Sequence, residues 1–368
     1  MTVKISVLKE TRPGEKRVAL VPVVADKLAK LGAEISFQSG AGLGSKLADS
    51  AYKSVKLVAE ADVVVCVQPP STDVIDAMKP GSVLLSFVYA HKEPELTRKL
   101  RDKKITCFAM ELVPRITRAQ SMDALSSQAA LAGYYGALLG ATTIGRMLPM
   151  TTFAVGSIKP GTVLVMGVGV AGLSAIATAR RIGARVEGYD VRPEVKEQVE
   201  SLGAKFIDTG VDARGQGGYA RELMAEEKEK IAAVVTKHIQ SADVIISTAA
   251  IPGRPSPKLI SKAQVDGMKS GAVIIDLAAE GGGNCEYSKP GETVQIGQVT
   301  VAAPLNVPSL LAEHASELYA KNQFNLFELM IKEKALKLDW SDEVIAKTCL
   351  THEGQIKNEA AKKAVEGG

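Results

Sequence analysis

Short apolar runs of strand length recur along most of the chain, and amphipathic stretches separate most of them. Ten such runs can be read, at 3–8, 34–38, 62–67, 83–88, 105–110, 162–167, 185–190, 243–248, 272–277 and 299–303. Strands that alternate with helices predict parallel sheets covered on both faces. The pattern therefore predicts an α/β protein with two Rossmann-like, doubly wound parallel-sheet domains, joined by long helices and with a cleft between them.

Three pairs of similar segments, in the same order, indicate that the two halves are related. Lys30–Ala33 matches Arg181–Ala184, Ala61–Val65 matches Ala242–Ile246, and Met78–Leu85 matches Met268–Ile275. The offsets are 151, 181 and 190 residues, so the second half carries an insertion between 184 and 242.

The strand and helix patterns also suggest domain boundaries. We expect an N-terminal domain from 1–123 with 304–352, a linker helix at 124–144, a second domain at 145–303 and a frayed tail at 353–368, where Lys, Ala, Glu and Gly dominate. Residues 124–145 carry no charge but include Ser, Gln and Thr side chains, so we expect a buried helix of a soluble protein and not a membrane span.

The composition is that of a core-forming globular protein. The chain has 368 residues, of which 46% are hydrophobic and 23% charged, with a net charge of +4. This balance favours neither a nucleic-acid binder nor an acidic scaffold. The four cysteines lack C-x-x-C spacing and the four histidines lack zinc-motif spacing, which fits a reducing cytosol and gives no case for a metal.

The segment 162–190 carries the strongest motif, a strand followed by Gly167-Val-Gly169-Val-Ala-Gly172, a helix-forming run and a strand ending in Asp190. This is the order of a dinucleotide-binding βαβ unit, in which the glycines allow a tight turn, close pyrophosphate approach and helix–strand packing. Asp190 suits a ribose 2′-hydroxyl and repels a 2′-phosphate, so NAD(H) is favoured over NADP(H), a preference that Arg192 weakens. The alternative is a glycine-rich turn in a nucleotide-free domain. The expected cofactor contacts are Gly167, Val168, Gly169, Val170, Ala171, Gly172, Asp190, Val191, Arg192, Tyr219, Ala249 and Glu280.

Two members of that set have open alternatives. Tyr219 lies in the polar, glycine-rich segment 208–229, which is either a plain surface loop or a mobile flap that closes on the nucleotide. Glu280 follows an apolar strand, where ligands meet such folds, but a structural loop carboxylate is equally compatible with its position.

The motifs together resemble the alanine dehydrogenase and proton-translocating transhydrogenase family. Lys9–Leu20 resembles its N-terminal signature and Gly167–Leu173 its second signature; Val113–Ser127, Gly217–Ala220 and Gly281–Glu286 are similar to the transhydrogenase branch. The resemblance covers roughly residues 1–330.

The resemblance implies the soluble NAD(H)-binding component of a transhydrogenase. It implies hydride transfer to NADP(H) on a partner component, coupling to proton movement through a separate membrane component, a homodimer, and a place on the cytoplasmic face of the inner membrane. It also implies that Arg115, Gln120, Asp123 and Ser126 contact the nicotinamide end. Transfer between two nicotinamides needs aligned rings and no acid or base, so orienting groups suffice. Alternatively, Asp123 or Ser121 caps the following helix and Arg115 is a surface charge.

Two other functions remain as alternatives. An alanine-type dehydrogenase requires acid–base chemistry, but the lysine and histidine positions of such enzymes align with Gln68 and Tyr89, with His91 two residues further on. Arg17 does match the family's substrate-side arginine. The third possibility is an NAD(H)-binding module without turnover of its own.

Overall fold

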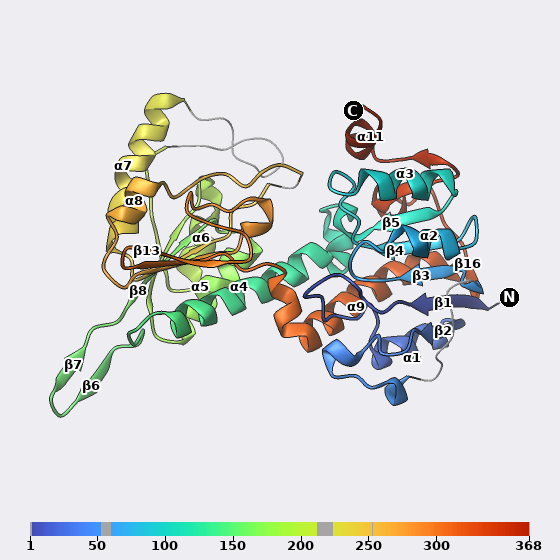
Figure 1. Ribbon diagram of the computed structural model, residues 1–368, viewed down its shortest axis with the longest axis horizontal. Helices are drawn as coiled ribbons and strands as arrows, with labels where there is room; N and C mark the ends of the chain where they lie inside the picture. The colour runs from blue at the N-terminus through green and yellow to red at the C-terminus, as the bar shows by residue number, and fades with distance from the viewer. Residues whose placement is uncertain (1, 53–59, 212–223, 252, 368) are drawn as a thin grey trace. The chain divides into compact units, whose positions relative to one another are not determined.

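The computed structural model describes residues 2–52, 60–211, 224–251 and 253–367 (Figure 1). The chain divides into two compact units, which we call unit 1 (residues 1–128 and 308–368) and unit 2 (residues 129–307). Helix α4 (Ala124–Thr143), predicted as a separate linker, contributes to both units, because the division falls after Gln128. Each unit contains one seven-stranded sheet.

Unit 1 is built on a sheet in which five adjacent strands are parallel. The order is β18 (Gln355–Ile356), β17 (Cys349–His352), β5 (Thr106–Ala109), β4 (Val83–Ser86), β3 (Val63–Val65), β1 (Val3–Val7) and β2 (Ala33–Phe37), with β17 and β18 antiparallel. Helices α1 (Pro22–Lys30) and α9 (Ala312–Met330) bury their apolar side chains with one face of this sheet. Helices α2 (Thr72–Ala77), α3 (Pro94–Asp102) and α11 (Glu359–Glu366) cover the other.

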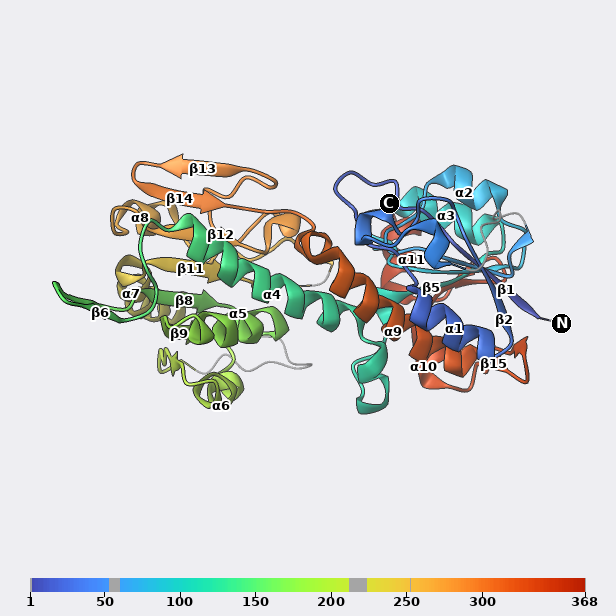
Figure 2. The ribbon, with the colours of Figure 1, turned by 90° about the horizontal axis from the view of Figure 1, so that it is seen from below.

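Unit 2 has the strand order of a dinucleotide-binding sheet. The order is β10 (Lys205–Phe206), β9 (Arg185–Tyr189), β8 (Thr162–Met166), β11 (Val244–Ser247), β12 (Val273–Asp276), β14 (Val299–Ala302) and β13 (Thr293–Ile296), and only β13 runs antiparallel. The parallel strands follow the order 3-2-1-4-5-6, which places ligands where the order reverses, between β8 and β11. Figure 2 shows these strands in succession from β13 to β9.

Helices cover both faces of the unit 2 sheet. Alternate side chains of β8 point to opposite cores, Val163 and Val165 to one and Leu164 and Met166 to the other. Helices α4, α5 (Val170–Arg181) and α6 (Lys196–Ser201) supply the first core, and α7 (Ala225–Ser241) and α8 (Lys262–Asp266) the second. Near-continuous apolar strands are typical of parallel sheets buried on both faces.

The predicted fold class is confirmed: nine of the ten predicted strands contain an observed one, and the prediction at 34–38 overlaps β2, which is shifted by one residue. The sequence missed β10, β13, β17 and β18, as well as the two hairpins β6–β7 (Thr151–Phe153, Gly156–Ile158) and β15–β16 (Ile331–Lys332, Ala335–Leu336). Most of these strands have only two or three residues, too few to show a period. The expected frayed tail is wrong for 355–366, which form β18 and α11: Ala361 and Val365, one helical turn apart, are buried in unit 1. The prediction rested on the Lys-, Ala-, Glu- and Gly-rich composition of this segment and overlooked the helical spacing of these two residues.

Candidate nucleotide-binding site

The glycine-rich turn between β8 and α5 combines a left-handed residue, an open position and a tight packing contact. Gly167 has φ +88°, and a Cβ there would lie 2.8 Å from the Ala249 nitrogen. A Cβ on Gly172 would lie only 2.0 Å from the Gly167 carbonyl oxygen. At Gly169, the N-cap of α5, a Cβ would meet nothing within 4 Å. The turn is closed where helix meets strand and open where a pyrophosphate would approach the helix N-terminus.

The neighbouring strand end fixes the other side of the turn. Thr248, directly after β11, donates from its hydroxyl to the Gly167 carbonyl at 2.7 Å. The fully buried Asn284 accepts from the Ala249 N–H at 3.0 Å and donates to the Ala249 and Pro257 carbonyls, both at 2.8 Å. Ala249 thus lies at the point where the strand order reverses, with both of its backbone groups bonded. Sequence reasoning missed the roles of Thr248 and Asn284, although Asn284 lies within the noted Gly281–Glu286 motif.

Asp190 directly follows β9, beside the same turn, and is anchored to it. Its Oδ2 accepts the Val168 N–H at 2.7 Å, and its Oδ1 accepts the Arg192 N–H at 2.9 Å. The Arg192 guanidinium also contacts the carboxylate, through Nε at 3.0 Å and Nη2 at 3.1 Å. The structure therefore brings together the glycines, Asp190 and Arg192 that the motif predicted.

The remaining predicted cofactor contacts have different outcomes. Val170 is exposed at the start of α5, and Val191 is partly buried beside Asp190. The exposed Glu280 accepts the Asn306 N–H at 3.1 Å, which gives this carboxylate a structural role in its loop. Tyr219 and residues 212–223 of the proposed flap lie outside the described residues.

The predicted nicotinamide-contacting residues lie in unit 1, from just before the short 3-10 helix η5 (Thr117–Met122) to the start of α4. Arg115 and Gln120 are exposed. Asp123 accepts the Ser126 N–H at 2.9 Å and the Ser126 hydroxyl at 2.7 Å. Asp123 thus caps α4, as the structural alternative expected, and this role is compatible with a ligand contact because a carboxylate has about four acceptor positions.

Helices α9 and α10 (Glu343–Thr348) hold this segment in place. The side chains of Asn322 and Asn325 both donate to the Ser121 carbonyl at 2.9 Å. Arg118 forms a two-pronged ion pair with Asp342 at 2.8 and 2.7 Å, and this pairing, against a smaller opposing effect of burial, lowers the pKa of Asp342 to about 2. A segment fixed in this way presents Gln120 from a constrained backbone.

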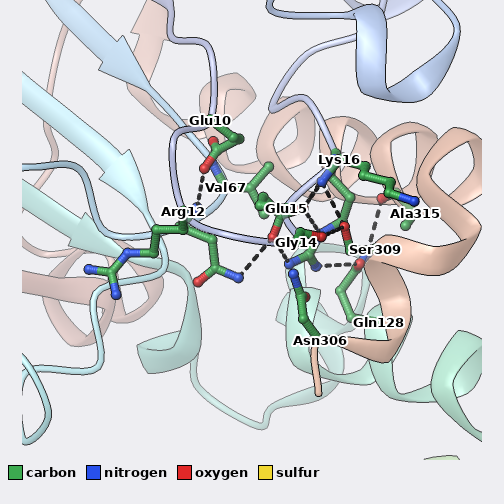
Figure 3. Close-up of polar contacts among 12 residues, drawn as sticks. Glu10, Arg12, Gly14, Glu15, Lys16, Val67, Gln128, Asn306, Ser309 and Ala315 are labelled. Atoms are coloured by element: carbon green, nitrogen blue, oxygen red, sulfur yellow. Dashed lines mark hydrogen bonds and ion pairs between the residues drawn. The ribbon is translucent and has the colours of Figure 1, made fainter. Parts of the chain in front are cut away.

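In unit 1 the corresponding strand ends, after β1 and β3, are filled by the protein's own carboxylates (Figure 3). Glu10 accepts the backbone N–H groups of Val67 at 2.6 Å and Gln68 at 3.2 Å. Glu15 accepts from Arg17 through Nε at 2.8 Å and Nη2 at 2.6 Å, and from the Gln68 amide at 2.9 Å. Since a carboxylate replaces the glycine turn here, this unit has the architecture without the fingerprint.

The Arg17 guanidinium bonds to Gln128 as well as to Glu15. Its Nη1 donates to the Gln128 side chain at 2.8 Å, and the Gln128 amide donates to the Ala315 carbonyl at 3.1 Å. The Arg17 and Glu15 side chains are 3% and 0% exposed. Burial favours a neutral Glu15, but the bonds and charge of Arg17 outweigh it and hold the pKa of Glu15 at about 2.

Glu10 titrates in a different range. Burial, aided by the Glu15 charge and opposed by the two backbone N–H groups, raises the pKa of Glu10 to about 7. The folded state therefore binds more protons than the unfolded chain between about pH 4.5 and 7, so stability falls as pH rises through this window. We expect Glu10→Gln to raise the melting temperature at pH 8 by about 3 °C and to leave it nearly unchanged at pH 5.

The control for this prediction is Glu34→Gln, which changes an exposed glutamate on β2. Scanning calorimetry from pH 5 to 8 should give parallel curves of melting temperature against pH for this control and the unmodified protein. A Glu10→Gln curve that stays parallel to both would show that Glu10 does not titrate in this range.

Comparisons with known proteins agree with this geometry. Residues 6–132 match the model "Alanine dehydrogenase/PNT, N-terminal domain" and residues 136–359 match "Alanine dehydrogenase/PNT, C-terminal domain". The chain is 45% identical to the first part of an NAD(P) transhydrogenase subunit alpha from Rhodospirillum rubrum, over 97% of this chain and 98% of the relative. It is 27% identical to an alanine dehydrogenase from Methanococcus maripaludis, over 98% and 96% of the two chains.

A solved structure extends the agreement to three dimensions. A transhydrogenase from Sinorhizobium meliloti is similar with a TM-score of 0.88 and 43% identity, covering 96% of this chain and 99% of that one. The matched domains together span almost the whole chain, and the glycine turn and the Glu15–Arg17 network each lie within one of them. This chain belongs to the alanine dehydrogenase/PNT family.

Proposed function

We propose that this chain is the NAD(H)-binding component of a proton-translocating NAD(P) transhydrogenase. The observation that carries the proposal is the turn at Gly167–Gly172, which is open above Gly169, with Asp190 bonded to Val168 of the same turn. The N–H groups that begin α5 suit the pyrophosphate, and the Asp190 carboxylate suits a ribose diol. The 45% identity to a transhydrogenase subunit, against 27% to an alanine dehydrogenase, supports the same assignment.

The chain's own residues then bind and orient the dinucleotide. Bound nicotinamide supplies the hydride chemistry, and the acceptor is NADP(H) on a partner component, with proton movement in a separate membrane component. Arg115, Gln120, Asp123 and Ser126 contact the nicotinamide end and fix its angle. The constrained segment 117–123 supports this role, because face-to-face transfer depends on alignment.

A place on the cytoplasmic face of the inner membrane follows from this role. Among the residues that the structure describes, no helix combines the length and apolar character needed to cross a bilayer.

At the aligned positions of unit 1, the side chains do not supply the acid–base chemistry of the dehydrogenase alternative. The Gln68 amide, at the lysine position of dehydrogenases, is neutral and bonded to Glu15. The Arg17 guanidinium, which could anchor a substrate carboxylate, holds Glu15 in a two-pronged pair. Tyr89 has a backbone φ of +52° and stacks on Phe87 with ring centres 5.5 Å apart. None of these three groups is a base at neutral pH. Arg17 and Gln68 both donate hydrogen bonds to Glu15.

A paired assay tests the function. We expect the purified chain to bind NADH more tightly than NADPH and to give no turnover with NADH, pyruvate and ammonia. Adding an NADP(H)-binding transhydrogenase component should produce hydride transfer from NADH. Turnover of alanine or pyruvate by the chain alone would establish the dehydrogenase instead, and binding without turnover even with the component would leave a binding module.

We also propose a homodimer, supported by the β6–β7 hairpin of unit 2. Residues 147–158 contain no charge, yet Met150, Phe153 and Val155 are 70%, 49% and 99% exposed. The hairpin projects away from its own sheet (Figure 1). Beside its base lies a hollow lined mainly by apolar residues, including Leu138, Ala141, Ile144, Leu148 and Ile182, together with Thr142 and Arg146. An apolar projection and an apolar hollow on one chain suit reciprocal contact between two copies.

Val155→Asp should therefore weaken dimerisation about 30-fold or more, because a charge would enter an apolar contact. Sedimentation over a concentration series measures this directly. Ser270→Asp, which adds the same charge at an exposed loop position, is the control and should leave the dimer unchanged. An unmodified protein that stays monomeric at all concentrations, or an unaffected Val155→Asp dimer, would contradict the proposal.

A further inference from the structure

The Asp190 carboxylate accepts four hydrogen bonds from the protein itself. A carboxylate offers about four acceptor positions. Val168 N–H and Arg192 Nη2 contact Oδ2 at 2.7 and 3.1 Å, and Arg192 N–H and Nε contact Oδ1 at 2.9 and 3.0 Å. A ribose diol would bring two further hydroxyl donors to the same group, so some existing donor has to leave.

Of these donors, the guanidinium is the group that can leave Asp190 by rotation of a side chain, without movement of the backbone. The Val168 N–H belongs to the glycine turn, between Gly167 and Gly169. The Arg192 N–H is held by its backbone, because Pro193 follows and restricts Arg192 to its observed extended conformation, φ −94° and ψ 112°. The Arg192 side chain, by contrast, is 26% exposed, whereas that of Asp190 is 7% exposed. Rotation about side-chain bonds would release both guanidinium donors from the carboxylate.

We propose that the Arg192 guanidinium is an internal counter-ion of Asp190 that the ribose diol displaces, and that it sets nucleotide selectivity in two opposing ways. This inference rests on the proposed function, since it assumes that the dinucleotide ribose binds at Asp190. For a nucleotide with a free 2′-hydroxyl, the guanidinium competes for the acceptor and weakens binding. For a nucleotide with a 2′-phosphate, the displaced guanidinium offers a planar pair of donors that offsets repulsion by Asp190. Arg192 therefore reduces the preference for NADH over NADPH that Asp190 provides.

Removing the guanidinium should shift the two affinities in opposite directions. In fluorescence titrations of the full chain, Arg192→Met should lower the dissociation constant for NADH about threefold, because a partly exposed ion pair no longer competes. It should raise the constant for NADPH about tenfold, because a charge-assisted contact is lost. Arg192→Lys keeps the positive charge but lacks the planar pair of donors. Its NADPH affinity should therefore lie between those of the unmodified protein and Arg192→Met.

A double variant distinguishes competition between Arg192 and the ribose for Asp190 from a general effect of Arg192 on the glycine turn. In Asp190→Asn there is no carboxylate for Arg192 to occupy, so adding Arg192→Met should leave NADH affinity unchanged within about twofold. Weaker NADH binding by Arg192→Met alone would mean that the guanidinium holds the nucleotide, and would overturn the inference. Equal shifts for NADH and NADPH would also overturn it. An unmodified chain that binds neither nucleotide would instead refute the proposed function.

The direct readout is the Arg192 Nε–H signal in ¹⁵N spectra. It should be protected from exchange in the free protein and lose that protection when NADH saturates the site. Protection that persists in the NADH complex would show that the guanidinium stays on Asp190, contrary to the inference.

Discussion

Gly169→Ala should weaken NADH binding about 100-fold while lowering the melting temperature by no more than about 2 °C. The added methyl group meets no protein atom within 4 Å, and Gly169 has an extended backbone, φ −84° and ψ −161°, that alanine also adopts. The space that the methyl group takes is the space through which a pyrophosphate reaches the α5 N-terminus. Loss of one or two charge-assisted contacts accounts for a change of this size.

Two other glycines make the test specific. Gly172→Ala places a methyl group 2.0 Å from the Gly167 carbonyl, so helix and strand have to separate. We expect it to lower the melting temperature by about 5 °C and to abolish NADH binding as well. Gly145→Ala, where nothing lies within 4 Å and the backbone is not left-handed, should change neither quantity. Calorimetry and NADH titration on all three variants measure the pattern. Tight NADH binding by Gly169→Ala would show that the pyrophosphate lies elsewhere.

Gln120→Ala should slow hydride transfer to partner-bound NADP⁺ about 100-fold while changing the NADH dissociation constant less than about threefold. The side chain is exposed at η5, on a segment that Asn322 and Asn325 hold by its Ser121 carbonyl. An amide there can donate and accept, which suits alignment of a nicotinamide carboxamide. Because no proton is transferred at the reacting carbons, lost alignment should appear in the rate and hardly in the affinity.

Single-turnover measurements of the reconstituted enzyme separate these two effects. Gln198→Ala removes an exposed glutamine amide from α6 and serves as the matched control, with rate and affinity both unchanged. If Gln120→Ala changes rate and affinity by equal factors, Gln120 contributes uniform binding and the alignment role is wrong.

The fold could be predicted from the sequence because its signals were local and repeated. Strands such as β8 and β11 are near-continuous apolar runs bounded by turns, and their similar order in both halves predicted two sheets. The nucleotide turn could also be predicted, since Gly167 has a left-handed backbone and Gly172 packs against the Gly167 carbonyl five residues away. The prediction for the tail was wrong, because Ala361 and Val365 contribute to the core only when α11 packs in unit 1.

The chain's order of residues by itself determined two parallel sheets, the turn at Gly167–Gly172 and the presence of an acid at Asp190. The tertiary structure alone decided which polar groups satisfy one another. It joined Glu10 to Val67, Arg17 to Gln128 and Asn284 to Ala249, pairs that lie 35 to 111 residues apart in the chain. Burial makes an unpaired polar group costly, so these partners are selected by the folded surroundings, and no spacing along the chain encodes them.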